Sequence, residues 1–113
     1  MSKPKWLTQP EGLEDRALSV WRYYGPGLHS CGRLGQNNAE SFRSLCRILA
    51  LCEAGSEQIE REGTVIKLST GTVRAHPAVK IVLDAQKAAV PLLRLFGLHQ
   101  EAQQNVYGAW EVK

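Results

Sequence analysis

The amino-acid sequence predicts a mainly α-helical fold with one small β-hairpin. Apolar residues recur at helical spacing in three long stretches. Between the second and third stretches, residues 64–75 form two short runs rich in β-branched residues around Gly71, a pattern typical of two strands and their turn. Glycine and proline separate the stretches, as expected where helices end.

The chain has 113 residues, which is enough for one compact domain. We expect a flexible basic arm, then a helical core that includes the hairpin, then a short C-terminal tail. The predicted ranges are 1–7 for the arm, 8–98 for the core, 64–75 for the hairpin and 99–113 for the tail.

The first helix is expected to begin near Thr8. This threonine stands three residues before a glutamate, as in a capping box, and Pro10 would lie in the first turn. An apolar stripe then continues to Tyr24. The sequence Gly25-Pro26-Gly27 is expected to end this helix, and residues 25–37 to form an irregular connection.

The second helix is expected to begin at Asn37 or Asn38, since asparagine is a favourable N-cap, and to end at Gly63. The third begins at His76-Pro77, with the proline in the first turn, and ends at Gly97. Pro91 lies inside this helix, where it is expected to kink it. One more short helix is expected at 101–107.

Composition and cysteine usage exclude several classes of protein. Hydrophobic residues make up 43% of the chain and charged residues 22%, as in ordinary globular proteins. No apolar run approaches the roughly 20 residues needed to cross a bilayer, and the first ten residues lack an apolar signal core. Three cysteines give no even disulfide framework. We therefore expect a cytoplasmic protein without a membrane partner, in which Cys46 and Cys52 are buried thiols.

Motifs that carry catalysis are missing from the sequence. It contains no phosphate-binding glycine loop, no nucleophile elbow and no zinc-protease helix. The nearest approach to a metal or nucleophile pair is His29 and Cys31, a spacing that arises readily by chance in a polar loop. We expect no enzyme activity, no cofactor and no metal.

The charge distribution is more informative than the net charge of +3. Residues 16–52 carry a local charge of +4, residues 53–62 a charge of −3, and residues 63–100 again +4. Arg43 and Arg47 are four residues apart and share one helix face. Arginine binds phosphate in a bidentate manner, so the basic stretches indicate a surface for nucleic acid or for an acidic partner.

The order of features along residues 7–105 resembles that of the small terminase subunits of tailed bacteriophages. The features are a proline-led helix with a tryptophan, a leucine- and glycine-rich connection, a Phe-x-x-Leu-Cys helix, a glycine before a hairpin, and a long apolar helix between two short motifs. In this sequence they are Pro10 to Trp21, Leu28 to Leu34, Phe42 to Cys46, Gly63, His76-Pro77-Ala78 and Leu95-Phe96-Gly97-Leu98.

The resemblance implies a function in viral genome packaging. Small terminase subunits bind viral double-stranded DNA at the start of packaging and assemble into rings. They regulate the large terminase subunit, which holds the ATPase and the nuclease, without catalysing either reaction. The expected protein is thus a helical protomer of a ring homo-oligomer, located in the bacterial host cytoplasm and not part of the mature virion.

Charge selects the residues expected to carry these contacts. A ring joins unlike faces of neighbouring subunits, so the alternating charges suit pairing between subunits as well as DNA binding. The alternative is a small helical adaptor that binds another protein, not DNA, through its apolar flank and the acidic 53–62 stretch. The candidate DNA-binding residues are Lys3, Lys5, Arg22, Arg33, Arg43 and Arg47, and the candidate oligomer-interface residues are Glu53, Glu57, Glu60, Glu62, Lys80, Lys87 and Arg94.

Overall fold

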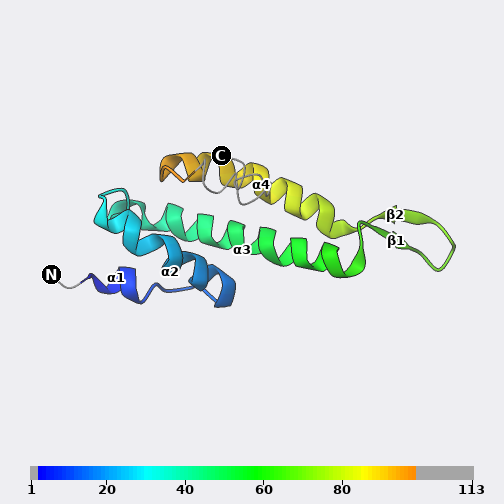
Figure 1. Cartoon of the computed structure of the whole chain (residues 1–113), viewed down its shortest axis with the longest axis horizontal. Coiled ribbons are helices and arrows are strands. Elements are labelled where there is room, and N and C mark those ends of the chain that lie inside the picture. The colour runs from blue at the N-terminus through cyan, green and yellow to red at the C-terminus, as the bar shows by residue number, and fades with distance from the viewer. Residues whose placement is uncertain (1–2, 99–113) are drawn as a thin grey trace, which may run out of the picture.

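A computed structural model describes residues 3–98 of the chain (Figure 1). The prediction of a mainly α-helical fold with one antiparallel hairpin is confirmed. The C-terminal tail, with the helix expected at 101–107, lies outside the described residues. In chain order the elements are α1 (Lys5–Thr8), α2 (Asp15–Ser30), the short 3-10 helix η1 (Gln36–Asn38), α3 (Ala39–Glu62), β1 (Val65–Lys67), β2 (Val73–Ala75) and α4 (Pro77–Leu95).

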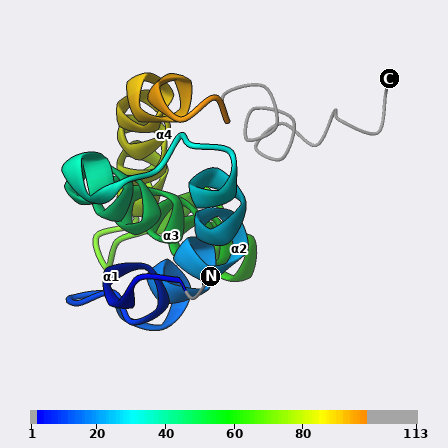
Figure 2. The same ribbon diagram turned by 90° about the vertical axis from the view of Figure 1, so that its left-hand side faces the viewer.

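Helix α3 is the centre of the fold. It pairs along its length with the antiparallel α4, and the β-hairpin joins the two helices and extends beyond their ends (Figure 1). Helix α2 packs on α3, with contacts that extend from Phe42 to Glu57, and it lies on a different side of α3 from α4 (Figure 2). The molecule is therefore elongated, with principal extents of 62, 35 and 20 Å.

The first helix does not begin at Thr8, which corrects the expectation from the capping-box spacing. Thr8 instead ends α1, and its hydroxyl donates backwards to the carbonyls of Pro4 and Lys5 at 3.5 and 3.4 Å. The next helix begins only at Asp15. The capping-box pattern was misleading because a threonine side chain can bond to the preceding turn as readily as to the following one.

Helix α2 continues through Gly25-Pro26-Gly27 and ends at Ser30. The prediction that these three residues end the helix is therefore wrong. A residue with a Cβ is disfavoured in helical conformation before proline, but Gly25 has none. Gly25 is buried, and a Cβ on it would lie 3.5 Å from Leu7 and 3.6 Å from Phe42. Packing on both sides of Gly25 therefore outweighs the cost of the proline.

The predicted beginnings and ends of the other helices are confirmed. Asn38 occupies the N-cap position of α3, but its side chain accepts from the Gly35 N–H and donates to the Arg33 carbonyl, and it does not bond to the first turn of the helix. Gly63, with φ of 83°, follows the last residue of α3. At the end of α4 the Leu98 N–H donates to the Leu93 carbonyl at 2.8 Å, and the Gly97 N–H donates to the carbonyl of Arg94, as in a Schellman motif. Pro91 does not divide α4, which is continuous from Pro77 to Leu95.

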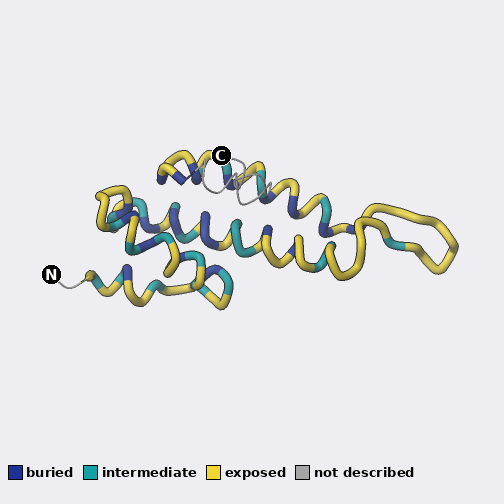
Figure 3. The backbone as a smooth tube through the Cα atoms, in the orientation of Figure 1, coloured by how far each residue is buried: buried dark blue, intermediate teal, exposed yellow. Residues whose placement is uncertain are grey.

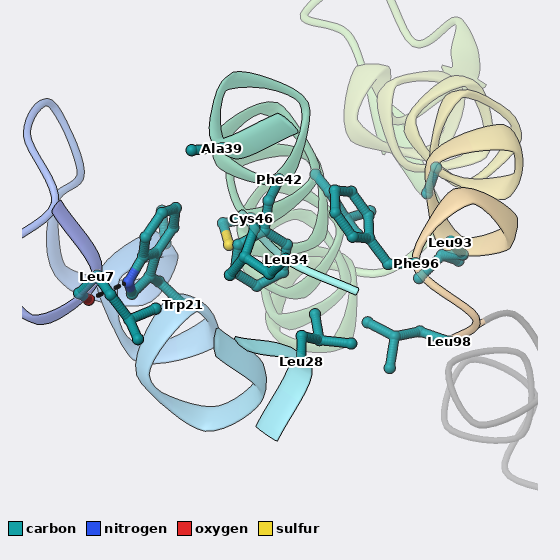
Figure 4. Packing of buried hydrophobic residues seen from close by; sticks show 13 residues of the cluster. Leu7, Trp21, Leu28, Leu34, Ala39, Phe42, Cys46, Leu93, Phe96 and Leu98 are labelled. Carbon is teal, nitrogen blue, oxygen red and sulfur yellow. Dashed lines mark hydrogen bonds between the residues drawn. The ribbon is translucent and has the colours of Figure 1, made fainter. Parts of the chain in front are cut away.

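An aromatic row forms the core (Figure 4). The ring centres of Trp21 and Phe42 are 4.9 Å apart, and those of Phe42 and Phe96 are 5.3 Å apart. All three side chains are almost fully buried. The Trp21 indole N–H donates to the Leu7 carbonyl at 2.7 Å. This row connects α1, α2, α3 and the end of α4, so the four segments form one packed unit.

Beyond the aromatic row, α3 and α4 approach each other closely. The face of α4 that packs on α3 is rich in alanine, with Ala78, Ala85 and Ala89 all buried. Opposite them is Gly55 of α3, where an added Cβ would lie only 2.5 Å from the Cγ2 atom of Val82. Small residues therefore set the distance between the two long helices.

Candidate nucleic-acid interface

Arg16, at the start of α2, forms the main ionic contact between α2 and α3. Its guanidinium group lies 2.6 Å from a carboxylate oxygen of Glu53 and 2.6 Å from one of Glu57. The hydrogen bond from Arg16 lowers the pKa of Glu57, and the two carboxylates raise the pKa of Arg16. Two of the acids expected at a subunit interface thus have a partner within their own chain.

Three of the four candidate DNA-binding arginines also contact their own chain. Arg33 donates to the Phe96 carbonyl at 3.4 Å, and Arg47 donates to the Gly12 carbonyl at 2.8 Å. Arg43 forms an ion pair with Glu40, one turn earlier on α3, and its side chain is 21% exposed. A guanidinium has five N–H donors, so the contacts of the exposed Arg33 and Arg47 leave other donors for phosphate. The Nε atom of Arg43 is buried and has no hydrogen-bond partner within the described residues.

The remaining candidates project into solvent at the N-terminal side of the fold. Lys3 precedes α1, Lys5 begins it, and Arg22 lies in the middle of α2. All three are exposed, and within residues 3–98 none has an ion pair or hydrogen bond through its side chain. They are therefore the candidates most accessible to a phosphate backbone.

The candidate interface residues also differ in whether their side chains pair within their own chain. The imidazole of His76 contacts Glu62 at 2.7 Å, and Lys80 pairs with Asp84 at 3.0 Å. Glu60, Lys87 and Arg94 are exposed. The assignment of these residues to an oligomer interface stays a prediction.

The structure adds a basic surface that the sequence reasoning did not select. Lys67 on β1 and Arg74 on β2 are both exposed on the projecting hairpin. The signal was present in the sequence, because no acidic residue occurs between Glu62 and Asp84. This surface was missed because two cations in twelve residues are a low density of positive charge. Only the fold shows that the hairpin projects away from the acids of α3.

A groove of about 590 Å³ lies between α2, α3 and α4. Its walls include Val20, Tyr23, Tyr24, Leu49 and Cys52, with the Arg16–Glu53 pair at one side. Burial raises the pKa of the Cys52 thiol. A buried thiol of this kind is a poor nucleophile at neutral pH, because the thiolate is the reactive form.

Metal-ligating side chains do not gather in the part of the chain that the structure describes: no group of three or more His, Cys, Asp or Glu residues is placed to hold an ion. Cys31 is exposed, whereas Cys46 is buried and burial raises the pKa of its thiol to about 12.

Across residues 3–98, no helix is both long and apolar enough to cross a membrane.

Comparison with known proteins identifies the family. A family model described as "Phage terminase, small subunit" matches residues 17–109, which is more than half of the chain. Searches of curated proteins and of solved structures found no match. The matched region spans α2, α3, the hairpin and α4. The protein therefore belongs to the phage terminase small-subunit family, which supports a role in phage DNA packaging.

Proposed function

We propose that this protein binds viral double-stranded DNA to initiate genome packaging, as a ring homo-oligomer that regulates the large terminase subunit. The observation that carries the proposal is the match to the small-subunit family over residues 17–109. The distribution of charge supports the DNA-binding part, because Arg16 pairs with two acids of α3 within the fold while other cations remain exposed. Exposed lysines and arginines bind the DNA backbone by releasing its counterions.

We expect the N-terminal cations to contribute to this binding. Arg22 is exposed on α2, and its replacement by glutamine removes one charge without disturbing a contact of the described fold. The matched control is Arg61→Gln, the same change at an exposed arginine of α3 that lies among acids. Lys3→Gln and Lys5→Gln extend the series to the first residues that the structure describes.

The experiment is a titration of the full chain with a fluorescently labelled duplex over a series of salt concentrations. We expect affinity for the wild-type protein to fall steeply with salt, with a loss of roughly 0.9 in the logarithmic slope for each phosphate contact removed by Arg22→Gln. Arg61→Gln should leave the slope near the wild-type value. If the wild-type protein does not bind DNA at low salt, or binds it independently of salt, the DNA-binding proposal fails.

The ring proposal is supported by the exposed apolar surface of α4. Ile81, Ala88 and Leu95 are spaced by seven residues, so they lie along one side of the helix. Ile81 is 47% exposed and Leu95 is 57% exposed, and Leu83 on the opposite flank is 51% exposed. A helix with apolar residues beyond its buried face has surface available for a neighbouring subunit.

The second candidate function is a helical adaptor that binds another protein and not DNA. The groove between α2, α3 and α4 favours it, because Tyr23 on its rim is 73% exposed and tyrosine is common at protein interfaces. An ATPase assay of a large terminase subunit with and without this chain separates the two functions. A change in ATPase rate that depends on DNA supports packaging, whereas tight binding of another protein without DNA binding supports the adaptor.

A further inference from the structure

Within residues 3–98, the hairpin of β1 and β2 stands apart from the helices. It projects past the ends of α3 and α4 along the long axis of the molecule, and it is exposed almost throughout (Figures 1 and 3). Val65 and Val73 are 56% and 59% exposed, and in residues 63–75 only Ile66 is partly buried. A two-stranded hairpin is marginally stable in water by itself, so one with both faces in solvent indicates a binding surface.

The base of the hairpin is held in a defined position. The backbone N–H of His76 donates to the Thr64 carbonyl at 2.8 Å, which closes the hairpin beside the last strand residues. The His76 ring contacts Glu62 at the end of α3 and accepts a hydrogen bond from the Ala78 N–H at the start of α4. The hairpin is therefore presented in a fixed direction by the two long helices.

All charges on the hairpin are positive, and they lie on both of its faces. The register pairs Lys67 with Val73, and Ile66 with Arg74. Successive side chains of a strand point to opposite faces, so the side chains of Lys67 and Arg74 leave the hairpin on opposite sides. One cation on each side suits a ligand with negative charge on both sides of the hairpin.

The turn supplies neutral hydrogen-bonding groups. Ser69, Thr70 and Thr72 form the turn with Gly71, whose φ of 91° is the left-handed conformation that glycine adopts readily. The hydroxyl groups of Thr70 and Thr72 lie 3.2 Å apart. Serine and threonine hydroxyls bind phosphates and base edges in protein–DNA complexes, and a backbone turn with small residues allows close approach.

We propose that the β-hairpin enters a groove of double-stranded DNA, with Lys67 and Arg74 binding the phosphates on either side. A two-stranded ribbon has strands about 4.8 Å apart and fits the major groove, which is about 12 Å wide. This proposal rests on the proposed DNA-binding function and adds a site at the opposite end of the molecule from Lys3 and Lys5 (Figure 1).

A second copy of the hairpin is the less favourable occupant. Two hairpins side by side would bring cations together without an acid on either ribbon, and like charges in directly opposed positions are destabilising. The strands are also only three residues long, so pairing of their edges would form few hydrogen bonds. DNA offers opposite charge on both sides, which a second hairpin does not.

The test compares four forms of the full chain in the duplex titration over a salt series. Lys67→Gln/Arg74→Gln removes both hairpin cations, and Lys67→Arg/Arg74→Lys exchanges them while keeping the charge. Arg61→Gln is the control, because it removes one cation from an exposed helix position that is neither a candidate DNA-binding residue nor a candidate interface residue. Circular dichroism and native mass spectrometry of each form establish that fold and assembly are unchanged.

The proposal predicts that the glutamine variant of the hairpin loses affinity roughly tenfold per cation near 0.1 M salt, with a salt slope reduced by about 1.8. The charge-keeping variant should bind the duplex with an affinity within about threefold of wild type. The affinity of the helix control should be closer to that of the wild-type protein than the affinity of the glutamine variant is. If the wild-type protein binds DNA and the hairpin variant equals the helix control, the hairpin proposal is overturned while the proposed function stands. If the wild-type protein does not bind DNA, the proposed function itself fails, and the hairpin proposal with it.

A cross-linking measurement gives an independent readout. Thr70→Cys places a thiol at the hairpin turn, and a photoreactive group is attached to this thiol. The exposed Cys31 is changed to serine in the same variant, whereas Cys46 and Cys52 are buried and can stay. Irradiation should attach this site to a labelled duplex more efficiently than the same group at position 61. Cross-links to a second protein chain in place of DNA would contradict the proposal and assign the hairpin to subunit contacts.

Discussion

His76 links the two long helices α3 and α4 through one imidazole ring. It is 6% exposed, its Nδ1 atom accepts a hydrogen bond from the Ala78 N–H at 3.0 Å, and its Nε2 atom lies 2.7 Å from Glu62. Since Nδ1 is the acceptor, the proton of the neutral ring is on Nε2 and is donated to the carboxylate. One side chain thus caps α4 and holds the end of α3.

Substitution of His76 separates these two contacts. Asparagine is a good N-cap but cannot replace the contact with Glu62, whereas alanine provides neither. We expect His76→Ala to lower the free energy of unfolding by about 1–2 kcal/mol and His76→Asn by less than half of that. Urea denaturation of both variants measures the difference, and equal losses would show that the cap does not contribute.

The same contact predicts a pH dependence. The hydrogen bond from His76 lowers the pKa of Glu62 below its ordinary value of 4.5. A carboxylate with a lowered folded pKa stabilises the fold above its unfolded pKa, and this contribution is lost as pH falls through the folded value. The difference in stability between wild type and His76→Asn should therefore narrow as the pH falls below 4.5, the ordinary pKa of the carboxyl group.

Residue-scale contacts also explain why the site could be predicted only in part. Charge patterning can select basic residues, and Arg22 is exposed in the fold. It could not find that Arg33 contacts Phe96 or that Arg47 contacts Gly12, because these partners lie 63 and 35 residues away. Such pairs depend on how helices pack, and local spacing carries no information about them.

At the scale of elements, local sequence signals predicted the positions at which α3 and α4 begin and end. The start of α3 after Asn38, the His76-Pro77 start of α4 and the Gly97 end of α4 depend on a few neighbouring residues, and these positions were predicted. Only His76 bonds to its helix as a cap, because the Asn38 side chain bonds to Gly35 and Arg33 instead. Helix α2 was predicted wrongly because its course through Gly25 and Pro26 depends on packing against α1 and α3. Tertiary packing outweighs helix propensity when a glycine before proline is also a buried contact.

Glycine has opposite roles in α2 and α3, which gives a matched pair of substitutions. A Cβ at Gly55 would lie 2.5 Å from Val82, whereas a Cβ at Gly27 would have no atom within 4 Å. Both residues are helical, so alanine gains about 1 kcal/mol of propensity at each. At Gly55 this gain is opposed by overpacking, which costs about 1–3 kcal/mol.

We therefore expect Gly27→Ala to raise the melting temperature and Gly55→Ala to lower it. Adding Val82→Ala to Gly55→Ala should recover part of the loss, because it removes the atom in contact with the new Cβ. Thermal denaturation of the three variants and of Val82→Ala alone completes a double-mutant cycle. Additive effects of the two changes would show that Gly55 does not set the separation of α3 and α4.

At the scale of the whole molecule, apolar surface and charge lie on different parts of the fold. The exposed candidate cations lie on α1, on α2 and on the hairpin, whereas helix α4, which carries the exposed Ile81 and Leu95, lies between the hairpin and the end of the molecule near α1 (Figure 1). A ring that buried the side of α4 defined by Ile81, Ala88 and Leu95 would leave the basic ends accessible. In the proposed ring, this chain would be the repeating unit of a larger assembly.

This arrangement predicts which substitution breaks the assembly. Ile81 of α4 and Leu51 of α3 are each 47% exposed, so glutamate at either position has a similar cost to the isolated fold. We expect Ile81→Glu, alone or with Leu95→Glu, to reduce the oligomer mass because it places a charge in the proposed subunit contact. Leu51→Glu should leave the mass unchanged.

Native mass spectrometry at micromolar concentration measures both variants against wild type. A wild-type protein that is strictly monomeric would overturn the ring proposal, and a loss of assembly with Leu51→Glu alone would move the interface from α4 to α3. If Ile81→Glu releases folded monomers, their DNA affinity becomes informative. The monomers should bind a duplex more weakly and with a shallower salt dependence than the assembly, because fewer cations contact the same DNA.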